Sequence, residues 1–242
     1  MKDLARLLCL ALIAGLAACS HAHVQTTQSY LGPSMPRPDH VYVSYFSITP
    51  DEVRLDQGVG ARIIRAADDQ PLSAQELKAA QDTQAALAQH IVARLRQYGL
   101  PAEIAMNAGG SANALLVQGQ IVSIDQGNRT RRILIGLGAG KSSIGADTQL
   151  YHLTETASPR FLMAFEGKAD SGRMPGAVET MGAGAAAERI GTSTAITGAT
   201  HAGAEMRSTS DTAEAANLGN EIALRVGQLA VAQGWIPQTA LQ

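Results

Sequence analysis

Residues 1–18 constrain the fold most, because they carry the pattern of a segment that is removed before the rest of the chain folds. Lys2 and Arg6 supply a short positive start, and Leu7 to Ala14 is continuously apolar. Small residues follow, as the cleavage site of a secretory signal requires. Cys9 leaves with this segment, and Cys19 is then the single thiol of the mature chain. No disulfide can form within the folded body, so its stability must come from an apolar core.

The cleavage region also predicts how the chain is anchored. Leu16-Ala17-Ala18-Cys19 resembles the lipobox of bacterial lipoproteins. The resemblance implies that the Cys19 thiol receives diacylglycerol and that cleavage exposes its amine for a further acyl chain. Ser20 follows where inner-membrane lipoproteins often carry Asp, which favours the outer membrane. The alternatives are an ordinary signal with an incidental cysteine, or a membrane-spanning anchor. Residues 7–18 fall short of the roughly 20 apolar residues that a spanning helix needs.

Composition restricts the remaining chain to a small-residue core. Aromatic residues make up 4% of the sequence, whereas glycine occurs 24 times. The formal net charge of −2 argues against a nucleic-acid surface. Residues 19–38 are polar and proline-containing, and they predict a lipidated N-terminus followed by a flexible tether with a span of roughly 25 Å. We expect residues 39–237 to form a single periplasmic domain.

Hydrophobic periodicity predicts two main helices. The first opens on a capping box, in which the Ser73 hydroxyl and Glu76 exchange backbone hydrogen bonds, and it ends before Gly99. The second opens at Ser210-Asp211, with Glu214 as the capping partner, and ends at Gly234. The expected strands are residues 41–48, 102–106, 115–124, 148–153 and 161–167, and the last two form a hairpin. The pattern predicts an α+β or α/β fold, with a mixed sheet packed by two helices.

Residues 175–210 are low in complexity, with glycine, alanine, serine and threonine dominating. One interpretation is a flexible or loosely helical excursion before the last helix. The other is a packed membrane hairpin, because small residues let backbones approach closely in lipid. Charged residues interrupt the segment, and neither half could span a membrane as a helix.

The glycine-rich stretch after residue 127 does not fit a nucleotide-binding loop. A phosphate-binding loop that ends in Gly140-Lys141-Ser142 requires a glycine at position 135, where the chain has Ile135. The dinucleotide fingerprint fails as well, because its third glycine falls on Lys141. We therefore expect no nucleotide and no other cofactor.

The same stretch resembles the domain-of-unknown-function 4410 lipoprotein family. The resemblance is carried by Val117-x-Gly119-x-Ile121, by Asp125-x-Gly-Asn-Arg-x-x-Arg132, and by the glycine-rich run 135–144. Leu137 stands where we expect an aromatic residue. The resemblance implies an envelope lipoprotein, and it implies no activity. From it and the residues together we predict a candidate interaction loop: Asn128, Arg129, Arg132, Gly136, Gly138 and Gly140. The arginines can meet lipid phosphates or a partner's carboxylates. The alternative is an ordinary tight surface loop.

No residue set in the sequence indicates catalysis. The six histidines are scattered without clustered carboxylates, so we expect no metal site, and no Gly-x-Ser-x-Gly elbow is present. The leading hypothesis is a non-enzymatic binding or envelope-assembly module on the periplasmic face of the outer membrane. Its expected partners are membrane lipid, through acylated Cys19, and either an envelope protein or further copies of the chain. Two alternatives stay open: an oligomeric channel component and an envelope hydrolase.

Overall fold

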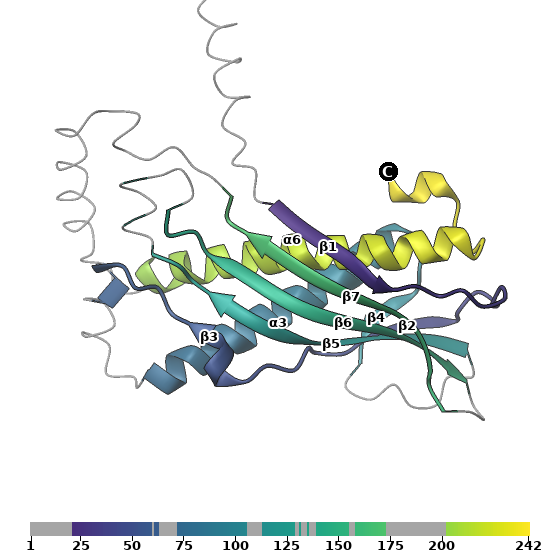
Figure 1. Cartoon of the computed structure of the whole chain (residues 1–242), viewed down its shortest axis with the longest axis horizontal. Helices are drawn as coiled ribbons and strands as arrows, with labels where there is room; N and C mark the ends of the chain where they lie inside the picture. The colour runs from purple at the N-terminus through teal and green to yellow at the C-terminus, as the bar shows by residue number, and fades with distance from the viewer. Residues whose placement is uncertain are drawn as a thin grey trace, which may run out of the picture.

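The protein folds as a mixed seven-stranded sheet with two long helices on one face (Figure 1). The structure is a computed structural model, which describes residues 21–59, 61–62, 72–105, 113–128, 131, 135, 139–154, 158–172 and 202–242. The helices are α3 (Leu72–Gln97) and α6 (Ala202–Ala232), and short 3-10 turns form η1 (Pro50–Glu52) and η2 (Gln238–Leu241). The strands are β1 (His21–Gln28), β2 (His40–Val43), β3 (Val53–Arg54), β4 (Ala102–Ile104), β5 (Asn113–Asp125), β6 (Ser143–Thr154) and β7 (Arg160–Asp170).

The strand order is β1-β7-β6-β5-β2-β4, with β3 also beside β5. Strands β1, β7, β6 and β5 are joined antiparallel, whereas β2 runs parallel to both β4 and β5. This arrangement confirms the predicted α+β fold with a mixed sheet. The hairpin that joins β6 to β7 is also confirmed.

The core lies between the sheet and the helices. Leu87, Ile91 and Leu95 of α3 are fully buried, and α6 contributes an equivalent stripe. Both helices end as predicted, because a glycine with positive φ follows each: Gly99 at 82° and Gly234 at 74°. A left-handed residue at this point bends the backbone away from the helix axis, and glycine adopts that conformation without a steric penalty.

The prediction of a flexible tether over residues 19–38 is wrong for most of its length. Residues 21–28 form β1, which pairs antiparallel with β7 along the edge of the sheet. The following segment is held as well: the Met35 backbone N–H donates to Gln233, and the Trp235 indole donates to the Met35 carbonyl at 2.9 Å. The polar composition of β1 is compatible with an edge strand, because only Val24 needs burial. Residues 19 and 20 lie outside the described chain.

The boundaries at the other end also differ from the prediction. Helix α6 begins at Ala202, so Ser210 and Asp211 do not open it, and the helix includes the end of the predicted excursion. Ala202 to Arg207 contains several strong helix formers, and a nucleated helix propagates readily through them. Residues 175–201 of the excursion are outside the described residues. The domain also continues past residue 237, because Leu241 of η2 packs against the core.

Candidate functional site

The predicted interaction loop begins and ends at a narrow neck between β5 and β6. The Asn128 backbone N–H donates to the carbonyl of Gly140 at 3.0 Å. Gly127 and Gly140 both have positive φ, at 68° and 70°. A Cβ atom on Gly140 would lie 2.4 Å from the Asn128 carbonyl oxygen, so no larger residue fits without displacing the backbone. The neck therefore explains why glycine stands at position 140.

Two of the six predicted loop residues, Asn128 and Gly140, lie within the described chain, and the structure brings them together. The other four predicted residues lie outside the described part of the chain: Arg129, Arg132, Gly136 and Gly138. The Asn128 side-chain oxygen accepts the backbone N–H of Arg131 at 2.9 Å, which turns the chain immediately after the neck. Arg131 is exposed, and so is 48% of Ile135. The loop thus presents a cation and an aliphatic side chain to solvent.

A buried polar network lies beneath this neck. The Gln126 amide donates to a carboxylate oxygen of Asp211 at 2.6 Å, and it accepts the Asp56 backbone N–H at 3.1 Å. On the other side of the neck, the Ser142 hydroxyl donates to Glu214. Asp211, Glu214 and Ser142 are all buried. Because a buried carboxylate is costly without hydrogen-bond donors, these contacts hold α6 against both ends of the loop.

The sequence pattern predicted a helix cap for Asp211 and Glu214 and gave no indication of this buried role. Asp211 and Glu214 precede Leu218 by seven and four residues, so they continue the apolar stripe of α6. Carboxylates on that stripe point at the sheet instead of at solvent. Their place on the stripe was the signal that could have identified them.

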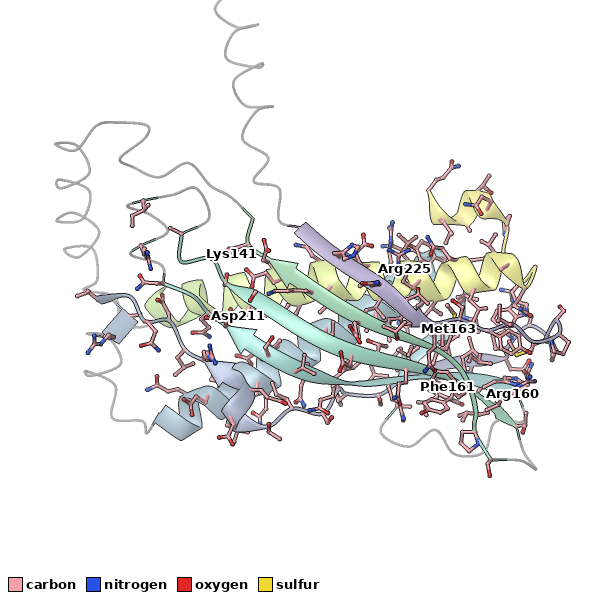
Figure 2. The ribbon with its side chains drawn as sticks, viewed as in Figure 1. Lys141, Arg160, Phe161, Met163, Asp211 and Arg225 are labelled. Carbon is pink, nitrogen blue, oxygen red and sulfur yellow. The ribbon has the colours of Figure 1, made fainter. Side chains whose placement is uncertain are left out.

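The N-terminal end of β1 lies at the same end of the sheet as the neck. His21 of β1 pairs with Asp170 of β7, and Asp170 pairs on its other side with Ser143 of β6. The Lys141 ammonium is 2.7 Å from a carboxylate oxygen of Asp170. Figure 2 shows Lys141 and Asp211 at this end, and Arg160 and Phe161 at the opposite end. We call the end that contains His21, Lys141 and the neck the anchor end of the sheet.

The face of the sheet turned away from the helices carries a row of apolar side chains. Tyr42, Leu116, Tyr151 and Phe161 are successive cross-strand neighbours on β2, β5, β6 and β7. The Tyr151 and Phe161 rings meet edge to face at 5.7 Å. The pairing of β6 with β7 has a bulge between Leu150 and Tyr151, which places Phe161 on the face turned away from the helices, the open face. Phe161 is 37% exposed there, whereas Met163 and Phe165 are buried. The row is thus accessible from solvent.

An open depression of about 630 Å³ lies beside the C-terminal end of α3. Its two arginines bind backbone carbonyls: Arg37 donates to Gly99 at 2.7 Å and Arg96 to Ala102 at 2.6 Å. Gly99 follows the C-terminal end of α3, where a cation stabilises the helix dipole, whereas the Ala102 carbonyl belongs to β4, so Arg96 joins α3 to that strand. These contacts account for both side chains structurally. The depression contains none of the residues predicted for the interaction loop.

Two other kinds of site are absent from the described part of the chain. It contains no group of three or more histidine, cysteine or acidic side chains placed to hold a metal ion. Neither α3 nor α6, as far as they are described, has the length and apolar character needed to cross a bilayer.

His152 lies opposite Arg160, far from the neck, with its Nε2 atom 2.9 Å from Asn113 Oδ1.

Fold and site define a two-layer α+β domain in which a glycine-necked loop and the first strand meet at one end of the sheet. The chain belongs to the family described as Domain of unknown function (DUF4410), whose model matches residues 41–188. No curated protein matches the sequence at a significant level.

Solved structures show distant likenesses. A PelC dodecamer from Paraburkholderia phytofirmans is 12% identical, with a TM-score of 0.37, over 83% of this chain and 96% of that chain. A dodecamer of a PelC point variant from the same organism is 14% identical, with a TM-score of 0.33, over 62% and 82%. A Xanthomonas campestris protein of the DUF330 family is 11% identical, with a TM-score of 0.37, over 86% and 99%.

Proposed function

We propose that the protein is a lipoprotein of the bacterial outer membrane, anchored through acylated Cys19, and that it serves as a non-enzymatic binding or assembly module. The observation that carries the anchoring is the sequence Leu16-Ala17-Ala18-Cys19 after a short apolar segment. Acyl chains on one cysteine give stable attachment, because every buried CH₂ contributes about 0.8 kcal/mol and two or more chains are present. Ser20 supports sorting to the outer membrane and a location on its periplasmic face.

The row formed by Tyr42, Leu116, Tyr151 and Phe161 supports the binding role. Aromatic residues are scarce in this chain, yet three of them lie in this row outside the core. An apolar patch with aromatic side chains is typical of protein–protein contact surfaces. The partner is an envelope protein or a second copy of the chain.

Acyl labelling tests the anchor. Cells fed radiolabelled palmitate should incorporate label into the wild-type protein and not into Cys19→Ala. The wild-type protein should also sediment with outer membranes. Persistent labelling of Cys19→Ala would refute the proposed anchoring.

Photo-crosslinking in intact envelopes tests the binding role. A crosslinking phenylalanine analogue at Tyr151 should give one discrete product, whose mass identifies a partner protein or a second copy. Tyr45 is the matched control, because it is 43% exposed and lies outside the row. Identical product patterns from the two positions would contradict binding through the row.

A further inference from the structure

The start of β1 restricts how far an acylated Cys19 can lie from the folded body. Only Ser20 separates Cys19 from His21, the first residue of β1. Two residues of extended chain span at most about 7 Å. His21 is held in the sheet by its pairing with Asp170. The Cα atom of an acylated Cys19 must therefore lie within about 7 Å of that of His21, at the anchor end of the sheet.

Two loops meet at this end, and both present aliphatic and cationic side chains. The Gln57 backbone N–H donates to the Gly127 carbonyl at 3.1 Å, which joins the segment after β3 to the neck. On that segment Val59 is 63% exposed and Arg62 is exposed. The loop beyond the neck contributes the exposed side chains of Ile135 and Arg131.

The carboxylates described at this end are mostly withdrawn from solvent. Asp211 and Glu214 are buried in the network beneath the neck. Asp170 is half-buried against Lys141, and the half-buried Asp125 accepts the Gly127 backbone N–H at 2.8 Å. Among the described residues of the two loops, Arg62 and Arg131 are the exposed charged side chains, and both are positive.

We propose that the anchor end rests on the anionic phospholipid surface that holds the lipid of Cys19, with Val59 and Ile135 entering the interface. Aliphatic side chains beside arginine and lysine are the composition that interfacial membrane contacts use, because apolar burial and attraction to anionic lipid act together. This orientation rests on the proposed lipidation of Cys19. Exposed apolar side chains also occur at the opposite end, at Leu31 and Phe161, but the covalent link brings only the anchor end to the bilayer.

The orientation has a consequence for the open face of the sheet. Strand β6 has 12 residues, so its far end lies about 40 Å from the anchor end at 3.3 Å per residue. Phe161 lies at the opposite end of the sheet (Figure 2), and Tyr151 is its cross-strand neighbour. With the anchor end on the bilayer, both side chains are therefore directed into the periplasm. The row is then free to meet a partner that is not in the membrane.

Fluorescence of single-cysteine variants tests the orientation in the acylated full-length protein. The introduced thiol is the one free thiol, because Cys9 is removed and Cys19 is acylated. The variants Ile135→Cys and Val59→Cys, labelled with an environment-sensitive dye, are reconstituted in vesicles of phosphatidylethanolamine and phosphatidylglycerol. We expect blue-shifted emission and quenching by nitroxide-labelled lipid. Leu31→Cys is the control, because Leu31 is 96% exposed and follows β1 at the opposite end.

The charge contribution is tested in the same assay. Arg62→Gln combined with Arg131→Gln should reduce quenching at position 135 toward that of the Leu31 control. Arg160→Gln, at the opposite end, should leave it unchanged. Neutral vesicles should reproduce the effect of the double variant.

A mass measurement of the mature N-terminus distinguishes failure of the proposed anchoring from failure of the proposed orientation. A chain without lipid on Cys19 refutes both the anchoring and the orientation. A lipidated chain whose labels at positions 135, 59 and 31 are equally water-exposed refutes the orientation alone. Shielding of position 135 in native envelopes, but not in pure lipid vesicles, also refutes it and indicates a protein partner at the anchor end.

Discussion

The inclusion of β1 in the cooperative core can be tested by Val24→Ala. Val24 is 1% exposed and pairs with Gly167, and both Val24 and Leu218 of α6 pack over that glycine. The substitution removes two carbon atoms from this contact. At about 0.8 kcal/mol for each buried CH₂, with a further term for the cavity, unfolding should become easier by about 2 kcal/mol.

Urea denaturation followed by Trp235 fluorescence measures this effect. Trp235 is the single tryptophan of the chain and is buried against the Met35 carbonyl, so unfolding changes its surroundings. The matched control is Val59→Ala, which makes the same chemical change at a side chain that is 63% exposed. The control should cost less than about 0.5 kcal/mol. If Val24→Ala matches the control, residues 21–28 act as a tether and our assignment of β1 to the core is wrong.

Three further substitutions test the neck, the core and the pH dependence. Gly140→Ala should lower the free energy of unfolding in urea by about 2 kcal/mol, because alanine would have positive φ and contact the Asn128 carbonyl; an unchanged midpoint would contradict the neck geometry. Thr148→Val should raise the same free energy by about 1 kcal/mol, because the buried Thr148 hydroxyl has no hydrogen-bond partner, and a loss of stability would argue against this reading. Burial, and then the nearby Arg160 charge, lower the pKa of His152 below 6.5. The unfolded chain therefore takes up the proton first, so stability from His152 is present above pH 6.5 and is lost as the pH falls. His152→Gln should flatten this decline in urea titrations at successive pH values, and an unaltered slope would refute the assignment.

We propose different roles for two surfaces of the protein: the anchor end of the sheet and the aromatic row on its open face. In the proposed orientation, the anchor end meets lipid through the acylated Cys19 and through the exposed side chains of Val59 and Ile135. The aromatic row lies toward the other end of the sheet, where a partner can reach it. A crosslink at Tyr151 and a quenched label at position 135 are independent results, so each surface can fail without the other.

Local chemistry made several elements predictable from the sequence. Gly99 and Gly234 mark the ends of α3 and α6, because a helix that ends on a left-handed residue favours glycine. The stripes of both helices and the hairpin of β6 and β7 follow from spacing over a few residues. The lipobox at Cys19 is a pattern of the same local kind, and it stays a prediction from sequence.

Only the tertiary structure decided which polar segments are part of the core. Residues 21–28 look like a tether in the sequence, since their pairing partner on β7 lies more than 130 positions away in the chain. In the sequence, Asp211 and Glu214 match the local pattern of a helix cap. The side chains that stabilise their burial, Gln126 and Ser142, come from the β5–β6 region, which is distant in the chain. Hydrogen bonds between distant segments leave no periodic signal, so only the structure could show that pairing in the sheet begins at His21.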